Sequence, residues 1–126
     1  MTHPDRPIKL GIIGAGFIGQ LAHIANYAQI KDCEIVALAA GRPELRRKVA
    51  ERYGINRTYS THRELLKDPE VEAVVAVTAR PGTGPVALDC LKAGKSLLTE
   101  KPMASTSEQA EKLIAAQPEN RVYTVG

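Results

Sequence analysis

Three glycines at a fixed spacing give this 126-residue sequence its clearest chemical signal. Gly14, Gly16 and Gly19 form the pattern G-x-G-x-x-G, directly after the apolar segment 8–13 and directly before a segment whose apolar residues have helical spacing. In such a strand, turn and helix, the first glycine permits a tight turn, the second lets the backbone approach a pyrophosphate, and the third lets the helix pack on the strand. The pattern predicts dinucleotide binding, because amide groups at a helix start bind phosphate; the alternative is a turn that only packs a helix against a strand. The predicted contacts are Gly14, Ala15, Gly16, Phe17, Ile18 and Gly19.

The end of the second apolar strand, 34–40, indicates which dinucleotide is bound. A fold that prefers NAD usually has an Asp or Glu here, about twenty residues after the glycines, which binds the ribose hydroxyls. No acid is present at positions 39–41, and Arg42 follows. A guanidinium suits a 2′-phosphate, whereas a carboxylate would repel it. We therefore predict NADP(H) as the preferred cofactor and NAD as the alternative, with contacts from Gly41 and Arg42 and further contacts from Arg46 and Arg47. The other interpretation of Arg42 is that it only begins a solvated helix.

Two later loops follow apolar strands, at 71–78 and 96–99. Because loops at the carboxyl ends of parallel strands line the ligand crevice of a doubly wound sheet, the first loop predicts cofactor contacts from Thr78, Ala79 and Arg80. The second loop is Glu100-Lys101-Pro102. Taken by itself, this loop favours an ion pair between Lys101 and Glu100 on a surface turn.

The elements that must position these loops alternate along the chain. Strands are expected at 8–13, 34–40, 71–78, 96–99 and 121–126, with a short extended piece at 57–59. Helices are expected at 17–30, at 43–53 with Gly54 as a left-handed cap, from a capping box at 61–64 through 66, at 85–94, and at 107–116 after a second capping box. The alternation predicts one α/β domain over 1–126, a doubly wound parallel sheet (Rossmann) of about six strands with helices on both faces, and a loose leader at 1–7.

Composition sets the remaining limits. The chain is 44% hydrophobic and 25% charged, with no apolar run that could span a membrane and no signal peptide, so we expect a cytoplasmic protein that does not bind a membrane. The net charge of +3 is dispersed, which argues against nucleic acid and favours a polyanionic small molecule. Cys33 and Cys90 lack the spacing of a disulfide framework or a metal site. We expect His23 to be solvated or to cap its helix rather than to be catalytic, and His62 to be exposed.

A resemblance to a known family rests on K-A-G-K at 92–95 and T-E-K-P-M-A at 99–104, read together with the glycine pattern. The chain resembles the N-terminal half of the glucose-fructose oxidoreductase / inositol dehydrogenase / MocA family over essentially its whole length. The resemblance implies that Lys101 is the catalytic residue near the nicotinamide and substrate, that Pro102 shapes the turn presenting it, and that Glu100, Lys101 and Pro102 lie at the cofactor. An ammonium at that position can donate a hydrogen bond to a substrate hydroxyl.

The chain also departs from the family pattern. Family members commonly have T-P-N and then a histidine, whereas here Thr78 is followed by Ala79 and Arg80, and Thr83 and Gly84 stand near the place of the histidine. The family's second domain, which supplies the substrate pocket and a catalytic histidine and acid, is not expected within this chain.

The resemblance therefore implies the nucleotide-binding domain of an NAD(P)-dependent oxidoreductase that acts on a sugar, a polyol or a related hydroxyl or carbonyl compound. We expect a fragment or truncation with little activity alone, whose substrate binds only when a second domain or partner is supplied, and which can form a homo-oligomer through exposed apolar surface. The alternatives are a stand-alone NADP(H)-binding module that senses the cofactor or assembles with a partner, and a Rossmann scaffold that no longer binds nucleotide.

Overall fold

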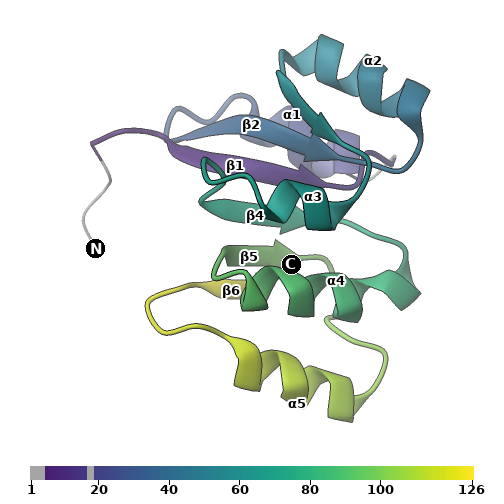
Figure 1. Cartoon of the computed structure of the whole chain (residues 1–126), viewed down its shortest axis with the longest axis vertical. Helices are drawn as coiled ribbons and strands as arrows, with labels where there is room; N and C mark the ends of the chain where they lie inside the picture. Colours follow the sequence, from purple (N-terminus) through teal and green to yellow (C-terminus); the bar gives the residue numbers. More distant parts are fainter. Residues whose placement is uncertain (1–4, 17–18) are drawn as a thin grey trace.

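Six parallel strands form one sheet in the order β3-β2-β1-β4-β5-β6, as drawn in Figure 1. The computed structural model describes residues 5–16 and 19–126. The chain runs outward in one direction from β1 to β3, returns to β4 on the other side of β1, and then runs outward again to β6. The expected doubly wound parallel sheet is confirmed, with its change of direction between β1 and β4. The strands are β1 (Ile8–Ile13), β2 (Cys33–Ala39), β3 (Arg57–Tyr59), β4 (Ala73–Ala76), β5 (Ser96–Thr99) and β6 (Tyr123–Val125).

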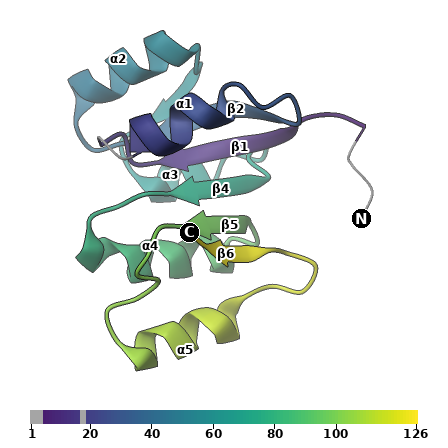
Figure 2. The ribbon, with the colours of Figure 1, turned by 180° about the vertical axis from the view of Figure 1, so that it is seen from behind.

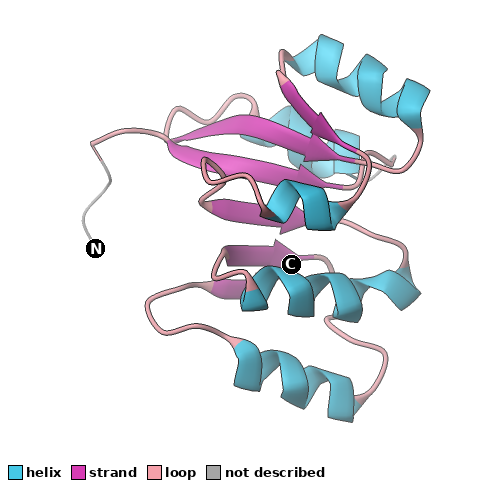
Figure 3. Ribbon diagram, in the orientation of Figure 1, coloured by secondary structure: helices cyan, strands magenta, loops and turns pink. Residues whose placement is uncertain are grey.

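Helices cover both faces of this sheet, and each face has its own apolar core. Seen from behind in Figure 2, α1 (Ala25–Tyr27) lies over β1 and β2, and α2 (Pro43–Tyr53) lies beyond them. Figure 3 shows α3 (His62–Leu66) and α4 (Arg80–Lys92) on the opposite face, with α5 (Ser107–Ala116) beside α4. Successive strand residues point to opposite faces. Ile12 accordingly packs in the core on the α1 and α2 side, while Ile13 packs in the core on the α3 and α4 side.

Several local predictions are confirmed because the turn chemistry decides them. Helix α2 ends at Gly54, which has a left-handed φ of 68° and donates its amide to the Ala50 carbonyl. Helix α3 begins after Thr61, whose hydroxyl accepts the Glu64 amide at 3.2 Å. Helix α5 begins after Thr106, which accepts the Gln109 amide at 3.1 Å. These caps act within a few residues, so the sequence alone identifies them.

The helix expected at 17–30 is wrong in type and length. The chain instead forms a π-helical turn, η1 (Gly19–Ile24), and then only three α-helical residues up to Tyr27. Residues 17 and 18 lie outside the described chain. The side-chain amide of Asn26 donates to the Ala22 carbonyl at 2.8 Å. Such side-chain bonds to the backbone compete with a regular helical ladder, which apolar spacing does not reveal.

The loop expected between the strand at 71–78 and the helix at 85–94 is wrong as well, because α4 already begins at Arg80. Pro81 lies in the first turn, where a helix needs no amide donor. Gly84 lies against the side chain of Gln109 on α5, where an added Cβ would collide. The glycine therefore permits close packing of two helices rather than a turn. Strands β4 and β6 are also shorter than the expected 71–78 and 121–126.

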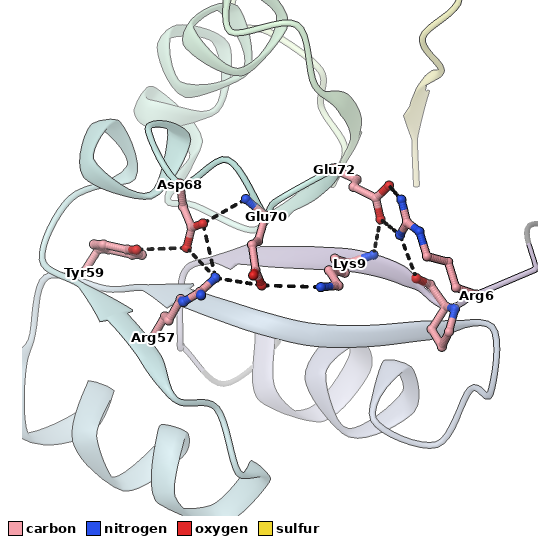
Figure 4. A network of polar contacts seen from close by, with 8 residues as sticks. Arg6, Lys9, Arg57, Tyr59, Asp68, Glu70 and Glu72 are labelled. Atoms are coloured by element: carbon pink, nitrogen blue, oxygen red, sulfur yellow. Dashed lines mark hydrogen bonds and ion pairs between the residues drawn. The ribbon is translucent and has the colours of Figure 1, made fainter.

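At the amino ends of the strands, charged side chains tie β1, β3 and β4 together, as Figure 4 shows. Arg6 donates two hydrogen bonds to Glu72, at 2.7 and 2.8 Å, so this part of the expected loose leader is anchored. Asp68, whose side chain is 3% exposed, accepts the Tyr59 hydroxyl at 2.9 Å and the Glu70 amide at 3.0 Å. This end of the sheet is therefore fixed by paired charges.

Candidate functional site

The first glycine of the motif forms the tight turn that the sequence predicts. Gly14 follows β1 with a φ of 101°, and its amide donates to the Ala39 carbonyl at 2.8 Å. A Cβ at this position would collide with the Val77 carbonyl oxygen. Only glycine combines this left-handed backbone with so close a neighbour. The turn therefore holds the ends of β1, β2 and β4 together.

The second glycine has a different environment. Within the described chain, nothing lies within 4 Å of a Cβ built on Gly16, which lines a cleft. A missing side chain here leaves room for another molecule at the backbone, as the pyrophosphate role requires. Gly19 begins η1. Two predicted contacts, Phe17 and Ile18, lie outside the described residues.

A cleft of about 690 Å³ opens at the carboxyl ends of β1, β2 and β4. It brings together predicted residues from three parts of the chain, namely the glycine turn, the end of β2 and the end of β4. It also includes residues at the start of α3 that the sequence did not indicate. The lining residues are Ile13, Gly14, Ala15, Gly16, Ala39, Ala40, Gly41, Arg42, Leu45, Ser60, Thr61, His62, Val77, Thr78, Ala79 and Val86.

Among these lining residues, Arg42 carries a positive charge, and no side chain carries a negative charge. Arg42 is exposed directly after β2, at the N-cap of α2, and no hydrogen bond or ion pair of its side chain is found within the described chain. The two arginines predicted as further contacts are engaged elsewhere. Arg46 donates to the Ala40 carbonyl at 2.7 Å, and Arg47 pairs with Glu51 at 3.0 Å on the surface of α2. Of these three arginines, Arg42 is therefore the one whose guanidinium has no partner within the described chain.

His62 is another part of this cleft, contrary to the expectation that it is solvated. Its Nε2 lies 2.7 Å from Asp89 Oδ2 on α4, and its side chain is 19% exposed. Sequence spacing does not reveal this pair, because 27 residues separate its members and α4 was expected to begin later. At the same end, the hydroxyls of Thr78 and Thr83 lie 3.4 Å apart. Arg80, a predicted contact, is the first residue of α4, and its side chain is outside the description.

The loop after β5 lies at the same edge of the sheet but outside the lining of this cleft. Lys101 and Pro102 are exposed, and the peptide bond between them is cis. Glu100 does not pair with Lys101. Its Oε1 lies 2.8 Å from His23 Nε2, so the alternative of a Glu100–Lys101 ion pair, which the loop favours when taken by itself, is not found in the described chain. His23, for which a solvated or capping role was expected, is only 9% exposed and so is not solvated.

Neither cysteine belongs to the site. Cys33 and Cys90 are free thiols, and burial raises the pKa of Cys90 to about 12. Within residues 5–16 and 19–126, no group of three or more His, Cys, Asp or Glu residues is arranged to hold a metal ion. The same residues contain no helix that is both long enough and apolar enough to cross a membrane.

Comparison with known proteins agrees with this geometry. The model of the Gfo/Idh/MocA oxidoreductase family, described by its NAD-binding Rossmann fold, matches residues 8–126. The trans-1,2-dihydrobenzene-1,2-diol dehydrogenase of Mus musculus is 30% identical over 117 residues, which are 92% of this chain and 35% of that protein. The myo-inositol 2-dehydrogenase of Thermotoga maritima is 29% identical over 107 residues, covering 85% of this chain and 32% of that protein.

Solved structures show the same arrangement. A 3-ketoreductase from Actinomadura kijaniata, in complex with NADP and TDP-benzene, superposes with a TM-score of 0.82 at 28% identity, covering 87% of this chain and 34% of that one. The chain therefore spans about one third of the length of these relatives. Since the family match extends from β1 through the end of β6, the chain belongs to the Gfo/Idh/MocA oxidoreductase family and has its NAD-binding Rossmann fold.

Proposed function

We propose that this chain is the nucleotide-binding domain of an NAD(P)-dependent oxidoreductase that prefers NADP(H) and acts on a sugar, a polyol or a related hydroxyl or carbonyl compound. The observation that carries the proposal is the cleft at the carboxyl ends of β1, β2 and β4, which combines the Gly14 turn, the open backbone at Gly16 and the unpaired Arg42. The relatives, named for diol, inositol and keto substrates, support the substrate class.

The residues present fit a dinucleotide. Gly16 leaves its backbone open to a pyrophosphate, and Gly41 and Arg42 leave the end of β2 without a carboxylate, so that a 2′-phosphate meets a donor rather than a like charge. Thr78 and Ala79, after β4, line the cleft on the side toward β5. The nicotinamide, when bound, supplies the hydride chemistry.

The catalytic contribution of this chain centres on Lys101. It follows β5, next to β4 in the sheet, so it lies at the same edge as the cleft. Its exposed ammonium can donate a hydrogen bond to a substrate oxygen, which polarises a carbonyl whose carbon accepts the hydride. Glu100 and Pro102 present this side chain from a short loop.

Titration of the chain with NADPH and with NADH, followed by cofactor fluorescence, tests the proposal. We expect saturable binding of both, with NADPH bound about tenfold more tightly, because a charge-assisted contact to phosphate contributes roughly 1.5–3 kcal/mol. Arg42→Ala should remove most of this preference and leave NADH affinity within about twofold. Arg47→Ala is the matched control, since Arg47 already pairs with Glu51 on the same helix.

Two results would contradict the proposal in different ways. Absence of saturable binding of either cofactor overturns the nucleotide-binding function. Tighter binding of NADH, or equal losses in the Arg42 and Arg47 variants, overturns the assignment of the 2′-phosphate to Arg42 and leaves the nucleotide-binding function intact.

A further inference from the structure

A buried histidine links the helical segment after the glycine turn to the loop that carries Lys101. His23 lies in η1 and Glu100 directly follows β5, 77 residues later. The His23 Nε2 and the Glu100 Oε1 are 2.8 Å apart, and the side chains are 11% and 32% exposed. A hydrogen bond to a charged carboxylate that is partly withdrawn from water is stronger than one between exposed groups. The contact therefore fixes the direction of the Glu100 side chain.

The conformation of the helical segment places His23 beside Glu100. The π-helical geometry of η1 ends at Ile24, and the His23 ring is stacked on Tyr27, with ring centroids 6.3 Å apart and planes at 14°. A π-turn changes the face on which a side chain emerges relative to a regular α-helix, and such turns are frequent at functional sites. Ile24, the next residue, is fully buried in the core beneath. The stacking on Tyr27 and the contact with Glu100 together restrict the His23 ring.

The position of Glu100 matters because its neighbour is Lys101. A carboxylate beside an ammonium in the same loop would ordinarily attract it, which is why the sequence favoured that ion pair. In the described chain no hydrogen bond or ion pair joins the two groups, and the Glu100 carboxylate is bound to His23. The ammonium is exposed.

We propose that His23 is a positioning residue, which keeps the Glu100 carboxylate turned away from Lys101 so that the Lys101 ammonium stays available to a substrate oxygen. The relevance of this device to catalysis rests on the proposed function, whereas the device itself is a property of the chain without cofactor. The histidine acts through Glu100 and touches neither cofactor nor substrate.

The test measures the proton affinity of each lysine in the chain without cofactor. Competitive acetylation between pH 7 and 11, followed by peptide mass spectrometry, reports all lysines in one sample, and Lys101→Arg identifies the relevant peptide. In His23→Leu the released carboxylate should approach Lys101 and raise its proton affinity about threefold to tenfold, because a nearby opposite charge favours the charged form. Lys48 and Lys112, which lie 3.7 Å from Glu44 and Glu108 on other helices, are internal references that should not change.

Three further variants distinguish a change in the position of the Glu100 carboxylate from a general loss of structure. His23→Gln keeps a donor that reaches the carboxylate and should leave Lys101 within twofold of the parent chain. His23→Asn is too short to reach it and should reproduce the rise, which keeps the test decisive if the leucine variant does not fold. The double change His23→Leu and Glu100→Gln removes the charge and should abolish the rise.

If the proton affinity of Lys101 is unchanged in a folded His23→Leu or His23→Asn variant, the proposal is overturned. It is also overturned if the rise in proton affinity persists in the double variant that lacks the Glu100 charge. A tenfold or greater fall in the proton affinity of Lys101 in the Glu100→Gln variant would also overturn the proposal, because Glu100 would then already be paired with Lys101 in the parent chain. These outcomes are independent of NADPH binding by the unaltered chain, so failure of this inference is distinguishable from failure of the proposed function.

Discussion

Arginines at the two ends of the sheet differ in whether they are paired. At the amino end, Arg6 pairs with Glu72, Arg57 pairs with Glu70 at 2.8 Å, and Asp68 is surrounded by donors (Figure 4). At the carboxyl end, Arg42 has no such partner within the described chain, and glycines, apolar side chains and hydroxyl-bearing side chains make up most of the cleft lining. Paired charges stabilise a structure, whereas an unpaired guanidinium beside an open cleft favours an anionic ligand. The difference supports the proposal that the cofactor binds at the carboxyl end, while the paired charges stabilise the amino end.

The largest expected effect comes from the glycine turn, where Gly14 serves the fold and Gly16 is proposed to serve cofactor binding. Gly14→Ala should lower the free energy of unfolding by roughly 2–5 kcal/mol, because it adds a Cβ against the Val77 carbonyl in a left-handed backbone. Gly16→Ala has open space for its Cβ and should change stability by about 0.5 kcal/mol or less. Urea unfolding followed by circular dichroism measures both.

The matching measurement for Gly16→Ala is cofactor affinity, which should fall tenfold or more because the added methyl group enters the cleft beside the backbone. Equal destabilisation by the two alanines would show that both glycines serve only the fold. Unchanged NADPH binding by Gly16→Ala would remove the reason for placing a pyrophosphate at this turn.

The next effect concerns the buried carboxylate at the amino end. Asp68→Ala leaves the Tyr59 hydroxyl and the Glu70 amide without their acceptor, so the free energy of unfolding should fall by roughly 2–4 kcal/mol. Asp68→Asn retains an oxygen acceptor and should lose less. NADPH affinity of either folded variant should stay within about twofold; a larger loss would mean that the two ends of the sheet are coupled.

The smallest effect is the pH dependence of stability that comes from Glu72, at the exposed edge of the charged network in Figure 4. The Arg6 hydrogen bonds, with the Lys9 amide, lower the pKa of Glu72 from 4.5 to about 2. Because this pKa is lower in the folded chain, the associated stabilisation is complete above pH 4.5 and is lost as the pH falls from 4.5 toward 2. Arg6→Ala should raise the pKa of Glu72 by about one unit or more in an NMR titration.

The control for this titration is Lys48→Ala, which removes the surface partner of Glu44 on α2 and should leave Glu72 unchanged. Burial alone would raise the pKa of Asp68, but the Glu70 amide, the Tyr59 hydroxyl and Arg57 together bring it below its usual value. The hydrogen bond from Arg57 also lowers the pKa of Glu70. All three carboxyls therefore change stability in the same direction on acidification. A thermal transition independent of pH between 5 and 2 would contradict that assignment.

Much of the fold and part of the site can be predicted from the sequence because the signals are local. Gly54 ends α2, Thr61 and Thr106 cap their helices, and Gly14 forms the turn after β1. Each of these depends on the conformational preference or hydrogen-bonding capacity of one residue within a turn, so neighbouring residues suffice to identify it.

The errors have a common cause in distance along the chain. His62 pairs with Asp89 across 27 residues, and Gly84 lies against Gln109 rather than in a loop. Neither contact can be read from the local pattern of prolines and glycines. Such contacts are decided when α3, α4 and α5 come together on one face of the sheet.

The sequence by itself determined the strand and helix alternation, the glycine turn and the absence of an acid after β2, because these are properties of residue type and spacing. Only the tertiary structure decided the partners of the histidines and carboxylates. Glu100 is adjacent to Lys101 in sequence but is bound to His23, because η1 and β5 meet at the same edge of the sheet. A side chain forms its hydrogen bonds with the groups that folding brings within reach, and proximity along the chain does not determine which groups those are.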